Sequence, residues 1–152
     1  MRVWRISKAK YAHSAFSGEG ARLFDARWNF AGSPMVYTSS SLALAAIEFF
    51  VHLDPSEAPM DLVSLMAEVP DSVAAERVEL EQLPHDWRRT DHQLLQQFGT
   101  EWIKSGRSGA LIVPSAVVDG EWNVLLNPGH PEFRRVQISE PIPFHYDERM
   151  FK

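Results

Sequence analysis

Residues 35–53 read MVYTSSSLALAAIEFFVHL, and this stretch predicts a short strand that runs directly into a helix. The strand-like residues 35–38 follow Gly32-Ser33-Pro34, which is typical of a turn. Serines 39–41 offer an N-cap, and Asp54-Pro55 ends the helix. The apolar residues between them recur at the helical period, which indicates one buried face. This face comprises Leu42, Ala45, Ala46, Phe49, Phe50 and Leu53.

Further elements are expected on both sides of this unit. A first strand is predicted at residues 3–6, and a loop at 14–20. The later strands are predicted at 62–69, 110–113, 123–126 and 134–138, with a second helix within 91–105. The acidic segment 70–84 is expected to be mostly loop, and 76–91 is the best candidate for a linker. Strands and helices interleave without a regular βαβ order, so the class expected is α+β, in one domain over residues 1–152.

Composition excludes several functional classes. The 152 residues contain no cysteine, which rules out disulfides, thiolate zinc sites and cysteine nucleophiles. The net charge of −5 argues against non-specific binding to nucleic acid. Residues 1–8 lack the apolar run of a signal peptide, and the most apolar stretches, 42–53 and 110–118, are too short to cross a membrane. A soluble cytoplasmic protein without membrane contact is therefore expected.

Glu48 interrupts the predicted helix on a side away from its apolar stripe. At helical spacing it projects roughly 130° from the centre of that stripe. One interpretation is a solvated helix face. However, its neighbours Leu44, Ile47 and Val51 are apolar, so the carboxylate could instead line a cleft or pair with a cation. The spacing favours neither interpretation over the other.

Arg27, Tyr37 and Ser115 are the other candidate site residues, and each has an ordinary structural alternative. Arg27 precedes Trp28, so the pair suits a phosphate or carboxylate with a flat ring stacked beside it, although a surface cation–π pair is more common. Tyr37 ends the predicted strand and faces either a cleft or the core. Ser115 lacks the Gly-x-Ser-x-Gly pattern of a nucleophile, so a hydrogen-bonding or capping role is the default.

Metal and nucleotide motifs are missing from the sequence. The six histidines form neither His-x-x-x-His nor His-Glu-x-x-His, and no metal site is expected. The glycines form neither a dinucleotide fingerprint nor a phosphate-binding loop. Basic residues do not cluster with aromatic ones, so a nucleic-acid-binding module has little support.

Taken together, several segments resemble the RES-domain family, named after an arginine, a glutamate and a serine that match Arg27, Glu48 and Ser115. The matching segments are Arg27-Trp28-Asn29, Gly32-x-Pro34-x-Val36-Tyr37-Thr38-Ser39, the helix with Leu44 and Glu48, Val113-Pro114-Ser115-Ala116-Val117-Val118, and Glu121-x-Asn123-Val124-Leu125-Leu126-Asn127-Pro128-x-His130-Pro131. Trp4-Arg5-Ile6 and residues 146–151 fit the two ends of the family. Residues 69–108 are the least diagnostic. Asp25-Ala26 stands where the family often has glycines, which could alter the shape of that loop.

The resemblance implies a toxin of a bacterial toxin–antitoxin pair, with a Xre-type helix-turn-helix antitoxin as partner. It also implies a split mixed sheet flanked by helices, similar to the ADP-ribosyltransferase fold, around a cleft for NAD⁺. Members of the family consume NAD⁺ by hydrolysis or phosphorolysis, or transfer ADP-ribose to a protein. A homodimer of the toxin within the complex is expected on the same ground. NAD⁺ is then the substrate, and no metal is needed.

The family's chemistry assigns a role to each candidate residue. Because nicotinamide is cationic in NAD⁺ and leaves as a neutral base, one carboxylate, Glu48, could suffice to stabilise the ribosyl cation. Arg27 would hold the pyrophosphate, with Arg5 as a second candidate, and Tyr37 would brace the nicotinamide side. Ser115 would bond the ribose or the carboxamide. Trp28 and Asn127 complete the expected NAD⁺-binding set.

Two alternatives to an NAD⁺-degrading enzyme remain at this point. One is an ADP-ribosyltransferase that modifies a specific host protein. The other is a non-catalytic module that binds a nucleotide or the antitoxin. Retention of Arg27, Tyr37, Glu48 and Ser115 together favours an enzyme, because a degenerate module would be expected to have lost at least one of them.

Overall fold

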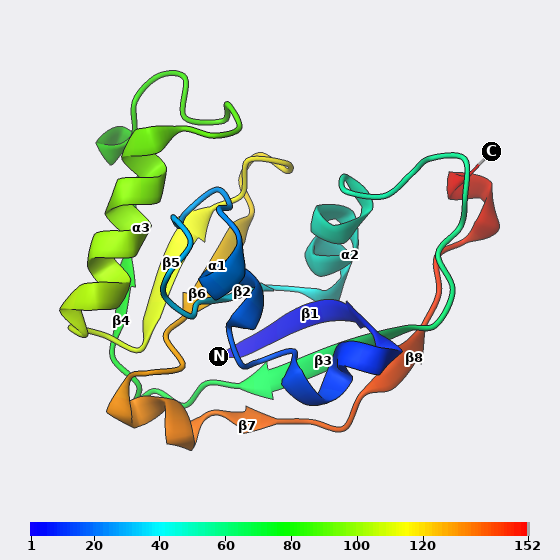
Figure 1. The fold of residues 1–152 in the computed structure, drawn as a ribbon, viewed down its shortest axis with the longest axis horizontal. Helices are drawn as coiled ribbons and strands as arrows, with labels where there is room; N and C mark the ends of the chain where they lie inside the picture. Colours follow the sequence, from blue (N-terminus) through cyan, green and yellow to red (C-terminus); the bar gives the residue numbers. More distant parts are fainter. Residues whose placement is uncertain (152) are drawn as a thin grey trace.

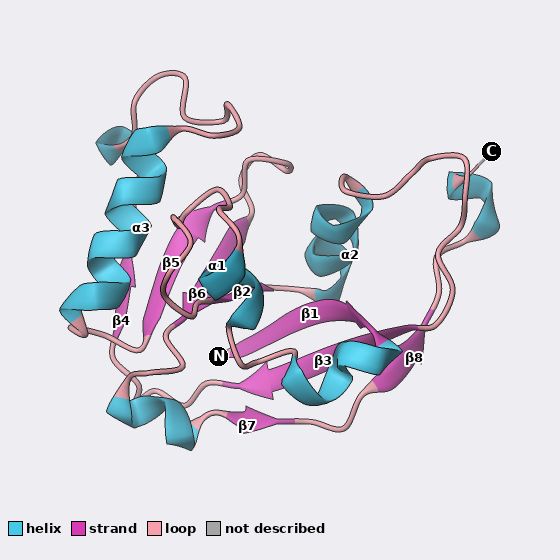
Figure 2. Ribbon diagram, in the orientation of Figure 1, coloured by secondary structure: helices cyan, strands magenta, loops and turns pink. Residues whose placement is uncertain are grey.

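A computed structural model describes residues 1–151, whose strands form one mixed sheet in the order β4–β5–β6–β2–β1–β3–β7, with β8 also paired to β3 (Figures 1 and 2). The only parallel pairing within this sheet joins β4 to β5. The strands are β1 (Arg2–Lys8), β2 (Val36–Ser39), β3 (Leu62–Glu68), β4 (Ala75–Arg77), β5 (Ala110–Pro114), β6 (Trp122–Leu126), β7 (Gln137–Ile138) and β8 (Ile142–Phe144). The helices are α1 (Glu19–Leu23), α2 (Leu42–Phe50) and α3 (Gln93–Ser105), with 3₁₀ turns η1 (Ala9–Ser14), η2 (Leu80–Gln82), η3 (Pro131–Arg135) and η4 (Glu148–Met150). The predicted α+β class is confirmed.

The sheet is split into two halves that meet between β1 and β2. In one half, β1 pairs with β3 along its whole length. In the other half, β2 pairs with β6 along all four of its residues. Between the halves the register has a single residue pair, Trp4↔Ser39. The expected split mixed sheet is therefore present, and its halves diverge on either side of this pair (Figure 1).

Helix α2 covers the half of the sheet that contains β1. Ser41 caps it as predicted, because its Oγ accepts a hydrogen bond from the Leu44 amide at 3.0 Å. The predicted stripe packs with Ile6, Leu62 and Tyr146, except for Leu42, which is exposed. The helix ends at Phe50, earlier than expected, because the amides of His52 and Leu53 bond to carbonyls three residues back, which tightens the last turn before Asp54-Pro55.

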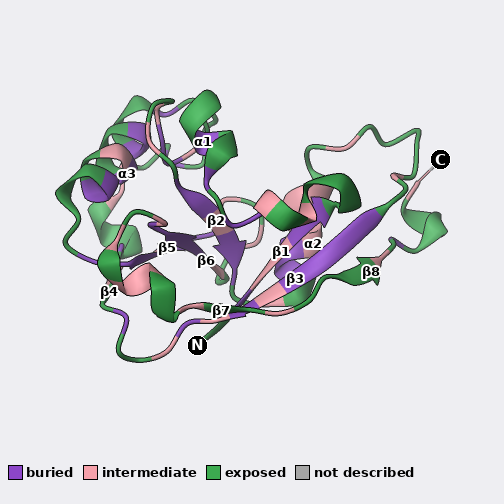
Figure 3. Ribbon diagram, turned by 60° about the horizontal axis from the view of Figure 1, so that its bottom comes forward, coloured by how far each residue is buried: buried purple, intermediate pink, exposed green. Residues whose placement is uncertain are grey.

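Helix α3 covers the other half and holds the loop that carries Arg27. The helix packs Leu95, Trp102 and Ile103 into a buried cluster, whose strands are purple in Figure 3. On its loop-facing side, Gln96 Nε2 donates to the Ala26 carbonyl at 3.1 Å, and Thr100 Oγ1 accepts from the Phe30 amide at 2.9 Å. These positions lie one helical turn apart, so the helix surface is shaped to fit residues 26–30.

Gly99 lies between these two contacts, where α3 meets the backbone of the same loop. A Cβ on Gly99 would lie 1.8 Å from the Trp28 carbonyl oxygen. We expect Gly99→Ala to destabilise the protein towards the upper end of about 1–3 kcal/mol, because the loop must move away from the helix. Thermal unfolding would measure this. The control is Gly20→Ala, whose Cβ would lie in open space and which should change stability far less. Gly120→Ala is unsuitable as a control because the φ of Gly120 is 84°, which strains any residue with a Cβ. Equal melting temperatures for both variants would contradict the prediction.

Several sequence-based predictions were wrong, most of them in the second half of the chain. Residues 76–91 are not a linker, because they include part of β4 and the side chains of Val78 and Trp87, which are 1% and 4% exposed. Because the surrounding residues are acidic, the sequence did not indicate that Val78 and Trp87 are buried. The predicted strand 134–138 is only partly a strand: its first two residues end η3, which starts at Pro131 after a His130 cap, and only Gln137–Ile138 form a strand. The sequence analysis also missed α1, within and after the predicted loop, and the short edge strand β8. In the part of the chain described, no helix is both long and apolar enough to span a bilayer.

Candidate active site

A cleft of about 780 Å³ opens where the sheet splits. Strand β1 contributes Arg5 to it, β2 contributes Tyr37, α2 contributes Glu48, and the loop before β2 contributes Arg27 and Trp28. Five of the seven predicted site residues thus line one cavity, although they come from four separate parts of the chain. The single pairing between β1 and β2 places these two strands side by side at the cleft without closing it.

Glu48 is half-buried, and one of its carboxylate oxygens is held by two hydrogen bonds. Oε1 accepts from Ser115 Oγ at 2.6 Å and from Asn123 Nδ2 at 2.7 Å. Within residues 1–151, Oε2 has no hydrogen-bond partner. It is not fully buried, so water or a ligand can reach it. The structure thus places Glu48 at the cleft rather than on a solvated helix face.

Ser115 lies at the end of β5 and reaches the cleft only through Glu48. Its side chain is 2% exposed, and its Oγ accepts from the amides of Val117 and Val118 at 3.1 and 3.0 Å. Its one hydroxyl proton is directed at Glu48. The hydroxyl therefore caps the turn after β5 and fixes the carboxylate, and it does not itself line the cleft.

Arg27 is half-buried and lies over the carbonyls of the segment 87–89. Its Nη1 is 3.4, 3.1 and 3.3 Å from the carbonyl oxygens of Trp87, Arg88 and Arg89. Burial lowers the pKa of Arg27, and the charge of Glu48 opposes this shift. The two charges form no direct ion pair in the structure. One edge of the guanidinium thus holds a loop, and the rest of it remains available to a ligand.

Tyr37 fixes the shape of the loop that carries Arg27. Its hydroxyl accepts from the Trp28 amide at 2.9 Å and donates to Asn29 Oδ1 at 2.7 Å. Burial raises the pKa of Tyr37, so the hydroxyl is neutral at physiological pH. Asp25 also braces the loop, since its Oδ1 accepts from the Ala31 amide at 2.7 Å. The loop therefore closes without the glycines that the family often has before the arginine.

Arg5 is a cation on the cleft wall without an acidic partner among the described residues. Its Nη1 donates to the Tyr37 carbonyl at 2.9 Å, whereas its buried Nε has no hydrogen bond in the structure. Burial lowers the pKa of Arg5. A buried guanidinium with an unused donor is unfavourable unless an anion or water satisfies it. The cleft lining therefore combines the guanidinium groups of Arg5 and Arg27 with the carboxylate of Glu48, and it also includes the acidic residues Glu19, Asp25 and Asp91.

Trp28 and Asn127 are placed differently from the other predicted residues. The Trp28 side chain is only 2% exposed and packs edge-on against Phe98, so it belongs mainly to the core. Asn127 follows β6 outside the cleft lining, where it donates to the Ile103 carbonyl at 3.3 Å and accepts from the Gly129 amide at 2.9 Å. The structure does not bring Asn127 to the other site residues.

The sequence analysis did not assign site roles to Ser39, Asn29 and Asn123. Ser39 and Asn123 line the cleft, and Asn29 anchors Tyr37. A polar asparagine at the start of an otherwise apolar strand was the available signal for Asn123. No signal in the sequence shows that Ser39 and Asn123 are partners across two strands.

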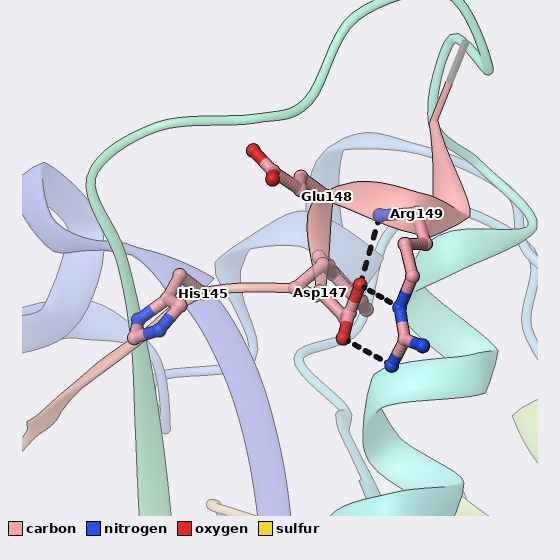
Figure 4. A pocket seen from close by; sticks show the side chains of 5 residues that line it. His145, Asp147, Glu148 and Arg149 are labelled. Atoms are coloured by element: carbon pink, nitrogen blue, oxygen red, sulfur yellow. Dashed lines mark hydrogen bonds and ion pairs between the residues drawn. The ribbon is translucent and has the colours of Figure 1, made fainter.

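A second hollow, of about 350 Å³, is formed by consecutive residues near the C-terminus. Figure 4 shows Asp147 turned towards Arg149, and the two side chains form a double contact at 2.9 and 2.8 Å. Asp147 and Arg149 are thus paired with each other, whereas Arg5 and Arg27 of the cleft form no ion pair with a described residue. Across residues 1–151, no group of three or more histidine or acidic side chains is arranged to hold a metal ion.

Comparisons with known proteins give a consistent result. The RES domain family model matches residues 2–147. A Photorhabdus laumondii protein named Toxin Res is 34% identical over 154 residues, covering 100% of this chain and 98% of the relative. The Prs ADP-ribosylating toxin of a Sphingobium species is 36% identical over 154 residues, covering 98% of this chain and 96% of the relative. A chain of the M. tuberculosis MbcT-MbcA toxin-antitoxin complex has the same fold, with a TM-score of 0.70 and 19% identity over 94% of this chain and 83% of that chain.

Proposed function

This chain belongs to the RES domain family, and from that premise we propose that it is the toxin of a toxin–antitoxin pair and an enzyme that cleaves NAD⁺ between nicotinamide and ribose. Depletion of NAD⁺ would then arrest growth. The observation that carries the proposal is the arrangement of Glu48. One oxygen is fixed by Ser115 and Asn123, the other has no hydrogen-bond partner among residues 1–151, and Glu48 lines a cleft that also contains two arginines.

The proposed reaction breaks the bond between the ribose C1′ and the nicotinamide nitrogen. The bonding electron pair moves onto that nitrogen, so the cationic ring leaves as a neutral base and needs no general acid. The free oxygen of Glu48 stabilises the positive charge that develops on the ribose. Water then adds at C1′ and releases a proton to the solvent, or the phosphate dianion adds through one of its oxygens without losing a proton.

Arg27 and Arg5 are proposed to bind the pyrophosphate of NAD⁺. Guanidinium groups form planar, bidentate hydrogen bonds with phosphate oxygens. Neither arginine is neutralised by a direct ion pair within the described chain, and Arg5 has a buried donor without a partner. Tyr37, Trp28 and Ser115 are proposed to complete the site, the first two by shaping its wall and Ser115 by holding Glu48. Asn127 is proposed only as a support of the fold after β6.

The test is to incubate the purified protein with NAD⁺ and follow free nicotinamide by chromatography, with and without phosphate. We expect nicotinamide to be released, and the second product to be ADP-ribose or, if phosphate is the acceptor, its phosphorylated form. A folded protein that arrests growth but releases no nicotinamide, alone or with protein acceptors, would refute the proposal. That result would instead favour a non-catalytic module that binds a nucleotide or the antitoxin.

Transfer of ADP-ribose to a protein is the second candidate function. It is favoured by the relative named Prs ADP-ribosylating toxin. The same bond breaks in both cases, and only the nucleophile that attacks C1′ differs. Labelled NAD⁺ distinguishes them, because transfer leaves the ADP-ribose label on a protein band, whereas hydrolysis and phosphorolysis leave it in small molecules.

We further propose a Xre-type helix-turn-helix antitoxin as partner, a homodimer of this chain within the complex, a cytoplasmic location, and one RES domain over residues 1–152.

Contact with DNA is assigned to the antitoxin. With a net charge of −5, the isolated chain is expected to show no DNA binding at physiological salt. A mobility-shift assay at that salt concentration measures this, and a shift caused by the chain alone would contradict it.

A further inference from the structure

We propose that Asn123 and Ser39 position the carboxylate of Glu48, and that Ser39 does so through Asn123. The inference rests on the proposed function of the cleft. Ser39 and Asn123 are direct neighbours in the register of β2 and β6. Ser39 Oγ donates to Asn123 Oδ1 at 2.8 Å, and Asn123 Nδ2 donates to Glu48 Oε1 at 2.7 Å. Together these contacts form a relay from the sheet to the carboxylate.

Ser39 anchors the end of the Asn123 amide that points away from Glu48. Its side chain is 4% exposed and lies where the amide oxygen can accept its proton. If the amide turned over, its oxygen would face the carboxylate and its NH₂ group would face the Ser39 hydroxyl. The first contact is repulsive because both groups are acceptors. The carboxylate therefore selects the donor end of Asn123, and the Ser39 hydroxyl holds the amide in place by bonding its oxygen.

The two donors to Glu48 come from different strands and converge on the same oxygen. Ser115 reaches Oε1 from the end of β5, and Asn123 reaches it from β6. A glutamate side chain has several rotamers, and two convergent bonds select one of them. This rotamer turns Oε2 towards the cleft. Asn123 and Ser39 act through Glu48, so they are positioning residues rather than catalytic ones.

This relay predicts a specific kinetic signature. Asn123→Ala should lower kcat about 10- to 100-fold, as expected for the loss of a hydrogen bond to a charged group. KM should change little, because Arg5 and Arg27 remain in place. Ser39→Ala should lower kcat by a smaller factor, and Ser39→Thr, which keeps the hydroxyl, should restore it. Ser7→Ala is the control, since Ser7 is a buried strand serine whose hydroxyl, within residues 1–151, bonds only to the Lys8 carbonyl.

A double-mutant cycle tests whether Ser39 acts through Asn123. In the Asn123→Ala background, adding Ser39→Ala should cause no further loss of rate. In the Glu48→Gln background, Asn123→Ala should cause little further loss. Independent, additive losses of rate for Ser39 and Asn123 would overturn the relay. A rise in KM with unchanged kcat would likewise overturn it, because that result would assign Asn123 to ligand binding.

Two readouts separate this proposal from the proposed NAD⁺ chemistry. Growth arrest on expression can be scored for the same set of variants, so a wild type that arrests growth without releasing nicotinamide refutes only the chemistry. Crystal structures of the wild type and of Asn123→Ala report on the carboxylate itself. We expect Glu48 to leave its wild-type rotamer in the variant. An unchanged Glu48 side chain in a folded Asn123→Ala protein would overturn the positioning role, whatever the reaction is.

Discussion

Replacing Glu48 with glutamine is expected to lower the rate of nicotinamide release by about 10²–10³-fold and to abolish growth arrest while the protein stays folded. Glutamine has the same size, and its amide oxygen can still accept from Ser115 and Asn123 at the position of Oε1. What it lacks is the negative charge that faces the ribose cation. The loss should therefore appear in kcat, as measured by steady-state release of nicotinamide.

The matched control is Glu101→Gln, which changes the same functional group on the exposed surface of α3. It should retain wild-type turnover, and both variants should unfold at similar temperatures. If a well-folded Glu48→Gln protein turned over NAD⁺ at nearly the wild-type rate, the carboxylate could not be the group that stabilises the transition state.

Replacing Arg27 with lysine is expected to weaken NAD⁺ binding about tenfold or more. Lysine keeps the charge but loses the planar fork that binds phosphate at two points. It also has three donors instead of five to share between the carbonyls of residues 87–89 and a ligand. Calorimetric titration in the Glu48→Gln background would measure the dissociation constant without consumption of the ligand.

Arg134→Lys provides the control for this measurement, because Arg134 is exposed and lies outside the cleft. Thermal unfolding of Arg27→Lys shows whether the segment 87–89 has merely lost its anchor. Unchanged NAD⁺ affinity in Arg27→Lys would remove Arg27 from the pyrophosphate site, and Arg5 would become its main candidate.

The sequence predicted those parts of the fold where one local signal was sufficient. The Ser41 cap and the apolar stripe of α2 identified that helix, and the β-prone runs identified β2, β3, β5 and β6. Short elements at the edge of the sheet, such as β4 and β8, gave no comparable pattern, because two or three residues cannot show a period. Their pairing depends on neighbours that are distant in the sequence.

The candidate site was predicted unevenly for the same reason. Arg27, Tyr37 and Glu48 follow from the resemblance to the RES-domain family, whereas spacing alone left each with two interpretations. Helical geometry put Glu48 off the stripe, yet only the tertiary structure shows that this side faces a cleft. The partnership of Ser39 with Asn123 spans 84 positions, and no periodicity in the sequence reports such a contact.

The contact between Gly99 and the Trp28 carbonyl has a consequence for genetics. Glycine is the one amino acid without a Cβ, so every missense change at position 99 introduces a residue that carries one. Each of these changes collides with the backbone beside Arg27. In a selection for cells that survive expression of this chain, mutations of codon 99 should be recovered alongside mutations of codon 48, although Gly99 touches neither Glu48 nor the substrate.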